Sequence, residues 1–147
     1  MRKLLLIILA LPFLLGATYY VDLDNGDNNW SGLTTNFTTA TGPFATIDYA
    51  DSVISPNDTV WVRFTTYPET LTVTNASTTW LGDTDGTVWA DSTDYPVIDG
   101  EDTRDYCATW AVSTISISGF SFHSSADSAI YINNNGVAQI SVGGNEK

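Results

Sequence analysis

The 147-residue sequence predicts an all-β fold, a solenoid of short stacked strands with one helix near its start. Three observations support this prediction. One amphipathic helix pattern occurs, around residue 50. After it, apolar and polar residues alternate in segments of three to five residues. Finally, Ile115-Ser116-Ile117-Ser118-Gly119 recurs as Ile140-Ser141-Val142-Gly143-Gly144, and this offset of 25 residues lies in the range of solenoid repeats.

The start of the chain, residues 1–17, has the pattern of a secretory signal peptide. Two basic residues precede an apolar run from Leu4 to Leu15, which two small residues follow. The run is shorter than the roughly 20 residues that cross a bilayer. We therefore predict that the mature chain starts near Thr18 and is secreted, either outside the cell or into the periplasm.

The charge balance restricts the partners of the mature chain. Seventeen acidic residues face five basic ones, for a net charge of −12, and the predicted signal removes two of the five. Such an excess opposes binding to nucleic acid or to an anionic membrane surface, which depends on Lys and Arg. Cys107 is the single cysteine, so no disulfide within the chain is possible.

The predicted elements follow one another in a simple order. An aromatic strand at residues 19–21 leads into a turn-rich loop at 22–32. Apolar residues at helical spacing predict a helix from Pro43 to Ile54, because Pro43 suits a first helical position and Pro56 stops the helix. The later strand patterns lie at residues 60–62, 71–73, 115–117, 120–122 and 130–132. Since two of these strands fall inside the 25-residue repeat, we expect three strands in each turn of a triangular coil.

Several segments occur in an order that is typical of one known family. They are Tyr19-Tyr20-Val21, the Asp/Asn/Gly loop, Pro43-Phe44 with Thr46-Ile47, the turn Pro56-Asn57-Asp58-Thr59-Val60, and Pro96-Val97-Ile98-Asp99-Gly100. This order resembles the start of a right-handed parallel β-helix of the pectate-lyase-like superfamily. The resemblance implies an N-terminal cap and the first coils of such a helix at residues 18–147. Because the chain ends just after a coil begins, we expect it to be the N-terminal part of a longer protein.

The resemblance also implies polysaccharide substrates or cell-surface glycans, often acidic ones, and leaves two functions open. The first is a polysaccharide lyase or hydrolase whose catalytic coils lie beyond Lys147. The second is a noncatalytic adhesin, surface protein or glycan-binding module. A lyase needs a cation beside a general base. Arg63, Arg104 and His123 are scattered along the sequence, and the acidic residues are too abundant to single out a hydrolase pair. We therefore predict no catalytic residues within the chain.

Calcium is the cofactor that the sequence favours. Asp22, Asp24 and Asp27, together with Asn25 and Asn29, supply closely spaced oxygen ligands in a turn-rich loop. The same composition is typical of a tight polar loop that binds no metal. We predict Asp22, Asp24 and Asp27 as the ligands if a metal binds, and we favour the polar loop over the metal site.

Outward-facing aromatic residues are the candidates for glycan contact. Strand alternation places Trp61 and Arg63 opposite the apolar residues of their strand, and Trp89 and Tyr131 are further outward candidates. Aromatic rings also fill small cores, and an arginine beside a strand often forms a salt bridge. We predict Trp61, Arg63 and Tyr131 as the substrate-binding residues.

Overall fold

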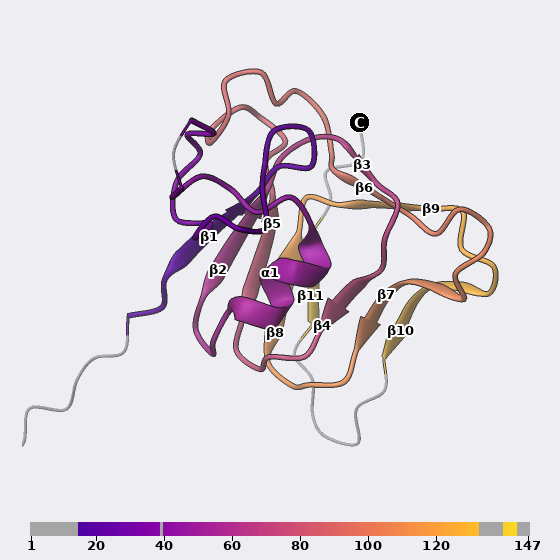
Figure 1. Cartoon of the computed structure of the whole chain (residues 1–147). Coiled ribbons are helices and arrows are strands. Elements are labelled where there is room, and N and C mark those ends of the chain that lie inside the picture. The colour runs from indigo at the N-terminus through magenta and orange to yellow at the C-terminus, as the bar shows by residue number, and fades with distance from the viewer. Residues whose placement is uncertain (1–14, 39, 133–139, 144–147) are drawn as a thin grey trace, which may run out of the picture.

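The computed structural model describes residues 15–38, 40–132 and 140–143, whose strands form three sheets with parallel pairing throughout (Figure 1). The first sheet has the order β1 (Thr18–Val21), β2 (Thr59–Val62), β5 (Thr79–Gly82), β8 (Ile115–Ser118) and β11 (Ile140–Gly143). The second sheet contains β3 (Thr66–Tyr67), β6 (Val97–Asp99) and β9 (Ser121–His123). The third sheet contains β4 (Leu71–Val73), β7 (Tyr106–Trp110) and β10 (Ser128–Ile132). The prediction of a mostly-β chain is confirmed.

The chain visits the three sheets in rotation. It passes from the first sheet to the second and the third, as β2, β3 and β4, and then returns to the first sheet at β5. Ile140 pairs with Ile115, so the predicted offset of 25 residues is the pairing register of β11 on β8. The earlier circuits differ in length, because Thr59 pairs with Thr79 and Thr79 with Ser116.

The hydrophobic core lies between the sheets and is built from the inward positions of the strands. As the alternation predicted, Val60 and Val62 are buried, and so are Ile115 and Ile117. Inward residues also meet from strand to strand, since Val60 pairs with Trp80, and Trp80 with Ile117. Each fully buried side chain of this size contributes about 1.5–3 kcal/mol to folding.

The helix α1 (Ile47–Val53) is shorter than predicted, and its start was predicted wrongly. Phe44 does not lie in the helix, because it forms a parallel bridge with Val21 at the free edge of β1. The helix begins after Thr46, whose hydroxyl accepts a hydrogen bond from the Tyr49 N–H. Pro43 therefore precedes the bridge residue Phe44 and does not lie in the first turn of the helix.

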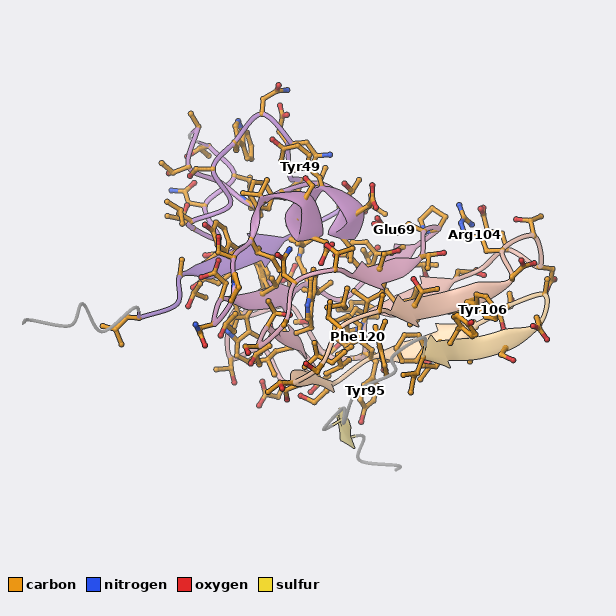
Figure 2. The ribbon with its side chains drawn as sticks, turned by 90° about the horizontal axis from the view of Figure 1, so that it is seen from below. Tyr49, Glu69, Tyr95, Arg104, Tyr106 and Phe120 are labelled. Atoms are coloured by element: carbon orange, nitrogen blue, oxygen red, sulfur yellow. The ribbon has the colours of Figure 1, made fainter. Side chains whose placement is uncertain are left out.

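The helix covers one end of the strand stack. Ile47 and Ala50 are buried in the core, and the helix packs against β4 and β1. In Figure 2 the N-terminal segments with α1 lie at one end and the strands after residue 100 at the other. The Glu69 carboxylate, just before β4, accepts the N–H groups of Ile47 and Asp48, both at 3.0 Å. Within the residues that the structure describes, no helix has both the length and the hydrophobicity needed to span a bilayer.

Candidate functional site

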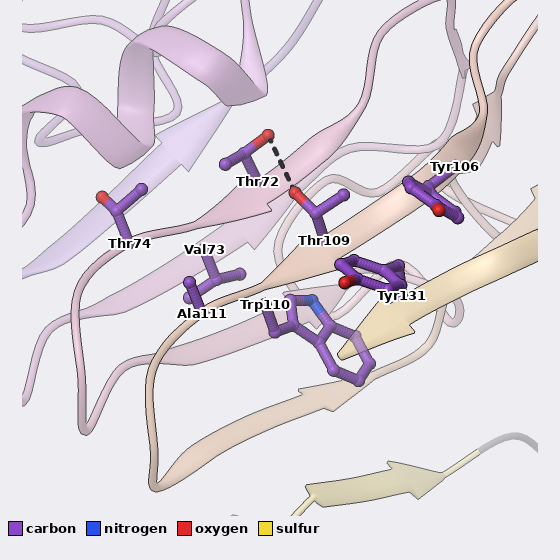
Figure 3. Close-up of a pocket in the computed structure, with 8 residues that line it drawn as sticks. All are labelled: Thr72, Val73, Thr74, Tyr106, Thr109, Trp110, Ala111 and Tyr131. Atoms are coloured by element: carbon purple, nitrogen blue, oxygen red, sulfur yellow. Dashed lines mark hydrogen bonds between the residues drawn. The ribbon is translucent and has the colours of Figure 1, made fainter. Parts of the chain in front are cut away.

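A groove on the outward face of the third sheet is a candidate site for a ligand. The cavity has a volume of about 300 Å³, at the lower end of the range of small-molecule sites (Figure 3). Its lining residues come from β4, β7 and β10 and from the positions that follow β4 and β7, namely Thr72, Val73, Thr74, Tyr106, Thr109, Trp110, Ala111 and Tyr131.

Strand register brings a row of polar side chains across this groove. Thr72 on β4 pairs with Thr109 on β7, and Thr109 pairs with Tyr131 on β10. The neighbouring residues Leu71 and Val73 are fully buried, so the alternation of the strand turns Thr72 away from the core. The Thr72 and Thr109 hydroxyl oxygens are 3.5 Å apart, and a hydrogen bond links them (Figure 3).

Two tyrosine rings form the aromatic part of the groove. The rings of Tyr106 and Tyr131 are stacked, with centroids 4.6 Å apart and planes inclined by 16°. Tyr131 remains 41% exposed, so one ring supports the other while part of the pair stays open to solvent. Desolvation, followed by the nearby Asp127 carboxylate, raises the pKa of Tyr106. The phenol therefore stays protonated at neutral pH.

The helix fixes the opposite part of the groove, at Thr74. The Asp51 carboxylate on α1 accepts the Thr74 N–H at 3.1 Å and the Thr74 hydroxyl at 2.5 Å. Asn75 donates its side-chain N–H to the Asp51 carbonyl oxygen at 3.0 Å. Asp51 is only 4% exposed, and burial raises the pKa of its carboxyl. A side chain of the groove is thus tied directly to the capping helix.

The chemistry available in the groove is hydrogen bonding and ring stacking. Its polar side chains are threonine and tyrosine hydroxyls, which both donate and accept, and its apolar surface comes from aromatic rings. None of the lining side chains ordinarily titrates near neutral pH. These groups are better suited to binding a neutral ligand with hydroxyl groups than to catalysing a proton transfer.

The three residues predicted to bind substrate do not lie together. Tyr131 lines the groove, whereas Trp61 lies on β2 of the first sheet and Arg63 directly follows that strand. The Arg63 guanidinium is bound by two carboxylates, at 2.8 Å from Asp22 and in close contact with Asp91. Its side chain is 16% exposed and that of Asp22 is fully buried, so the arginine joins two loops of the protein.

Trp89 was predicted to face outward, and this is wrong. Its residue exposure is 6%, and its ring meets the ring of Tyr20 edge-on at 5.9 Å. The connection between β5 and β6 that carries Trp89 lies at the same end of the molecule as the loop after β1 (Figure 1). This connection therefore covers part of the outward side of the first sheet.

Two of the three predicted calcium ligands, Asp22 and Asp27, accept hydrogen bonds from N–H groups of their own loop. Asp22 accepts the backbone N–H groups of Asp24 and Asn25, and Asp27 accepts the backbone N–H of Asn29. Across residues 15–38, 40–132 and 140–143, no group of three or more His, Cys, Asp or Glu side chains could hold a metal ion. Calcium binding and the metal-free polar loop both stay predictions of the sequence.

The other two basic residues considered for lyase chemistry, Arg104 and His123, also have protein partners. Arg104 donates to Glu101 and to the Pro68 carbonyl oxygen, both at 2.6 Å. The His123 ring lies 2.9 Å from the Ser121 hydroxyl, measured at Nε2.

No family model matches this sequence. Searches of curated proteins and of solved structures gave no match either. The interpretation of the groove therefore depends on its own geometry.

Sequence reasoning found one residue of the groove and missed the others. Tyr131 was predicted, but Tyr106, Thr72 and Thr109 were not singled out. Thr72 and Thr109 are 37 residues apart in the sequence although they pair directly, so the repeat of 25 residues does not align them. The alternation that places Thr72 and Thr74 opposite Leu71 and Val73 was a usable signal for the β4 side of the groove.

Proposed function

We propose that this chain belongs to an extracellular parallel β-helix protein and binds polysaccharide through the groove of the third sheet. The rotation of the strands through three parallel sheets supports the β-helix architecture, with α1 as its cap. The order of sequence segments supports a relationship to the pectate-lyase-like superfamily and the right-handed form. The apolar run at residues 4–15 supports secretion.

The stacked pair of Tyr106 and Tyr131 beside a row of threonine hydroxyls is the observation on which the binding role depends. A pyranose ring has an apolar face of C–H groups and a rim of hydroxyls. Tyr131 offers a partly exposed ring to the face, and Thr72 and Thr109 offer donors and acceptors to the rim. Because the tyrosines support each other before any ligand arrives, little side-chain freedom is lost on binding.

Binding is favoured over cleavage for this groove. A general acid or base works best when its pKa lies near the working pH. The lining side chains do not meet this condition, and burial and the neighbouring carboxylates move the pKa of Tyr106 further away from neutrality. In the enzymatic alternative, a lyase or hydrolase, the groove holds the substrate and other groups perform the chemistry.

The experiment compares two aromatic residues on different sheets. Binding of the chain to a panel of soluble polysaccharides is measured by affinity electrophoresis, for the natural protein and for Tyr131→Ala and Trp61→Ala. We expect Tyr131→Ala to weaken retention at least about tenfold, the effect of losing roughly 1.4 kcal/mol. Trp61→Ala should leave it nearly unchanged. Equal losses in both variants, or no retention by any polysaccharide, would contradict the proposal.

The same samples separate binding from catalysis. After incubation, new ultraviolet absorbance indicates an unsaturated lyase product, and new reducing ends indicate hydrolysis. We expect neither from this chain. Either signal, if abolished by Tyr131→Ala, would favour the enzymatic alternative.

A further inference from the structure

We propose that the groove selects an uncharged glycan over acidic or basic ones, an inference that rests on the proposed binding function. The family resemblance by itself implies acidic polysaccharides as the usual ligands. The residues of the groove instead favour an uncharged glycan. Three properties of the described residues support it: the lining, the charges around the groove, and the partners of the described arginines.

The lining carries no formal charge. Its residues are three threonines, two tyrosines, a tryptophan, a valine and an alanine. A sugar carboxylate that entered this cavity would lose part of its hydration without meeting a cation. Burying a charge without a partner is costly, whereas a sugar hydroxyl can exchange water for the threonine hydroxyls.

Carboxylates lie around the groove. On the Thr74 side, Asp51 is buried on the helix and bonded to the Thr74 hydroxyl. On the Tyr106 side, desolvation raises the pKa of the tyrosine hydroxyl, and the negative charges of the Asp127 and Asp105 carboxylates help to raise it. Water and salt screen the exposed pair Asp105 and Asp127, so these carboxylates oppose an acidic chain only weakly, and the main cost to a uronate is the lack of a cation in the lining.

The described arginines are committed to other contacts. Arg63 is bound to Asp22 and Asp91, and Arg104 to Glu101 and the Pro68 carbonyl oxygen. Neither of them lines the groove, so neither is placed to receive a uronate carboxylate.

A basic glycan gains little from the same surroundings. Asp51 is buried and already accepts two hydrogen bonds from Thr74, so it offers no open position to an ammonium group. Asp105 and Asp127 are exposed, and ion pairs at exposed positions contribute little because water and salt screen them. A neutral chain therefore fits the groove best.

The test measures binding of three kinds of hexasaccharide by calorimetry. The probes are cellohexaose and xylohexaose as neutral chains, hexagalacturonate as the acidic chain, and a glucosamine hexamer as the basic one. We expect a neutral probe to bind at least about tenfold more tightly than either charged probe. Its affinity should change less than about twofold between roughly 0.1 M and 1 M salt, over which the Debye length falls from about 10 Å to about 3 Å.

A matched pair of variants tests the charge argument directly. Thr72→Lys places a cation in the groove, and Thr66→Lys places one on β3, which belongs to the second sheet. Thr72→Lys should raise the affinity for hexagalacturonate about tenfold, the size of one hydrogen bond between charged groups, and Thr66→Lys should not. A gain of the same size in both variants would overturn the argument.

The outcomes distinguish this inference from the proposed function. If no probe and no polysaccharide binds, the proposed function fails. If hexagalacturonate or the glucosamine hexamer binds more tightly than the neutral probes, and Tyr131→Ala removes that binding, the groove is a glycan site but the inference of neutral selectivity is wrong.

Discussion

The outward faces of the first and the third sheet both carry residues predicted to bind glycan, but the two faces differ in how far loops cover them. Trp61 and Arg63 mark the first face, and Tyr131 marks the third. On the first, loops cover part of the surface: Trp89 meets Tyr20, and Arg63 ties the loop after β1 to the β5–β6 connection. On the third, the described lining of the groove comes from the strands and from the positions directly after β4 and β7, and the tyrosine pair remains partly exposed. An outward position in a strand is therefore available to a ligand only where the neighbouring connections leave it open.

The largest expected effect comes from breaking the ionic contact on the first face. Arg63→Ala leaves the fully buried Asp22 carboxylate without its cation, which should cost about 3–5 kcal/mol of unfolding free energy. Arg104→Ala is the control, because its ion pair with Glu101 is largely exposed and should contribute about 1 kcal/mol or less. Urea unfolding of both variants provides the measurement. A similar loss in both would mean that Arg63 is not a structural link between loops.

A smaller effect is expected from the tyrosine pair on the third face. A double-mutant cycle with Tyr106→Ala and Tyr131→Ala should give a coupling energy of about 0.5–1.5 kcal/mol, as for stacked aromatic rings. Neither single variant should unfold the protein, because Tyr131 is exposed and Tyr106 is only partly buried. Additive losses in urea unfolding would show that the rings do not support each other.

The smallest expected effect is a pH dependence of stability caused by Asp51, in contrast to another buried carboxylate, Asp22. Asp22 has an ionic partner, whereas the Asp51 carboxylate is hydrogen-bonded to the hydroxyl and the N–H of Thr74, and burial raises its pKa from 3.8. The folded chain then binds a proton at Asp51 more tightly than the unfolded chain does. Charged Asp51 therefore lowers stability at neutral pH, and this penalty disappears as the pH falls through the raised pKa.

The measurement is the unfolding free energy at about pH 7 and about pH 4 for the natural chain and for Asp51→Asn, which cannot titrate. The natural chain should gain stability relative to the variant as the pH falls. Glu69, whose pKa burial also raises, contributes in the same direction to both proteins and cancels in the comparison. An unchanged difference between the two pH values would contradict the assignment to Asp51.

Much of the fold could be predicted from the sequence because inward residues alternate regularly in most strands. β2, β4 and β8 follow this rule, and Asn57 in the predicted turn adopts a left-handed φ of 76°, which asparagine tolerates. The strand β7 was not identified. Cys107 and Ala108 are adjacent and both buried, which breaks the alternation on which the prediction depends.

The site was less predictable because it depends on residues that only the register brings together. Tyr131 was found from its own strand, but its partner Tyr106 comes from the strand that lacked a clear pattern. Arg63 could be recognised as an ion-pair candidate, whereas its partners Asp22 and Asp91 lie 41 and 28 residues away. A sequence pattern records which way a side chain points, but not which connection lies over it.

The parallel register has a consequence for how the chain acquires its structure. Every described strand after the first one of its sheet pairs with a strand that lies earlier in the sequence, as Thr59 with Thr18 and Ser116 with Thr79. A later segment therefore meets a partner strand that has already been synthesised, and each added strand depends mainly on its immediate neighbour in the stack. We expect folding to begin at the end that α1 covers and to continue as each later strand pairs with the strand before it in its sheet.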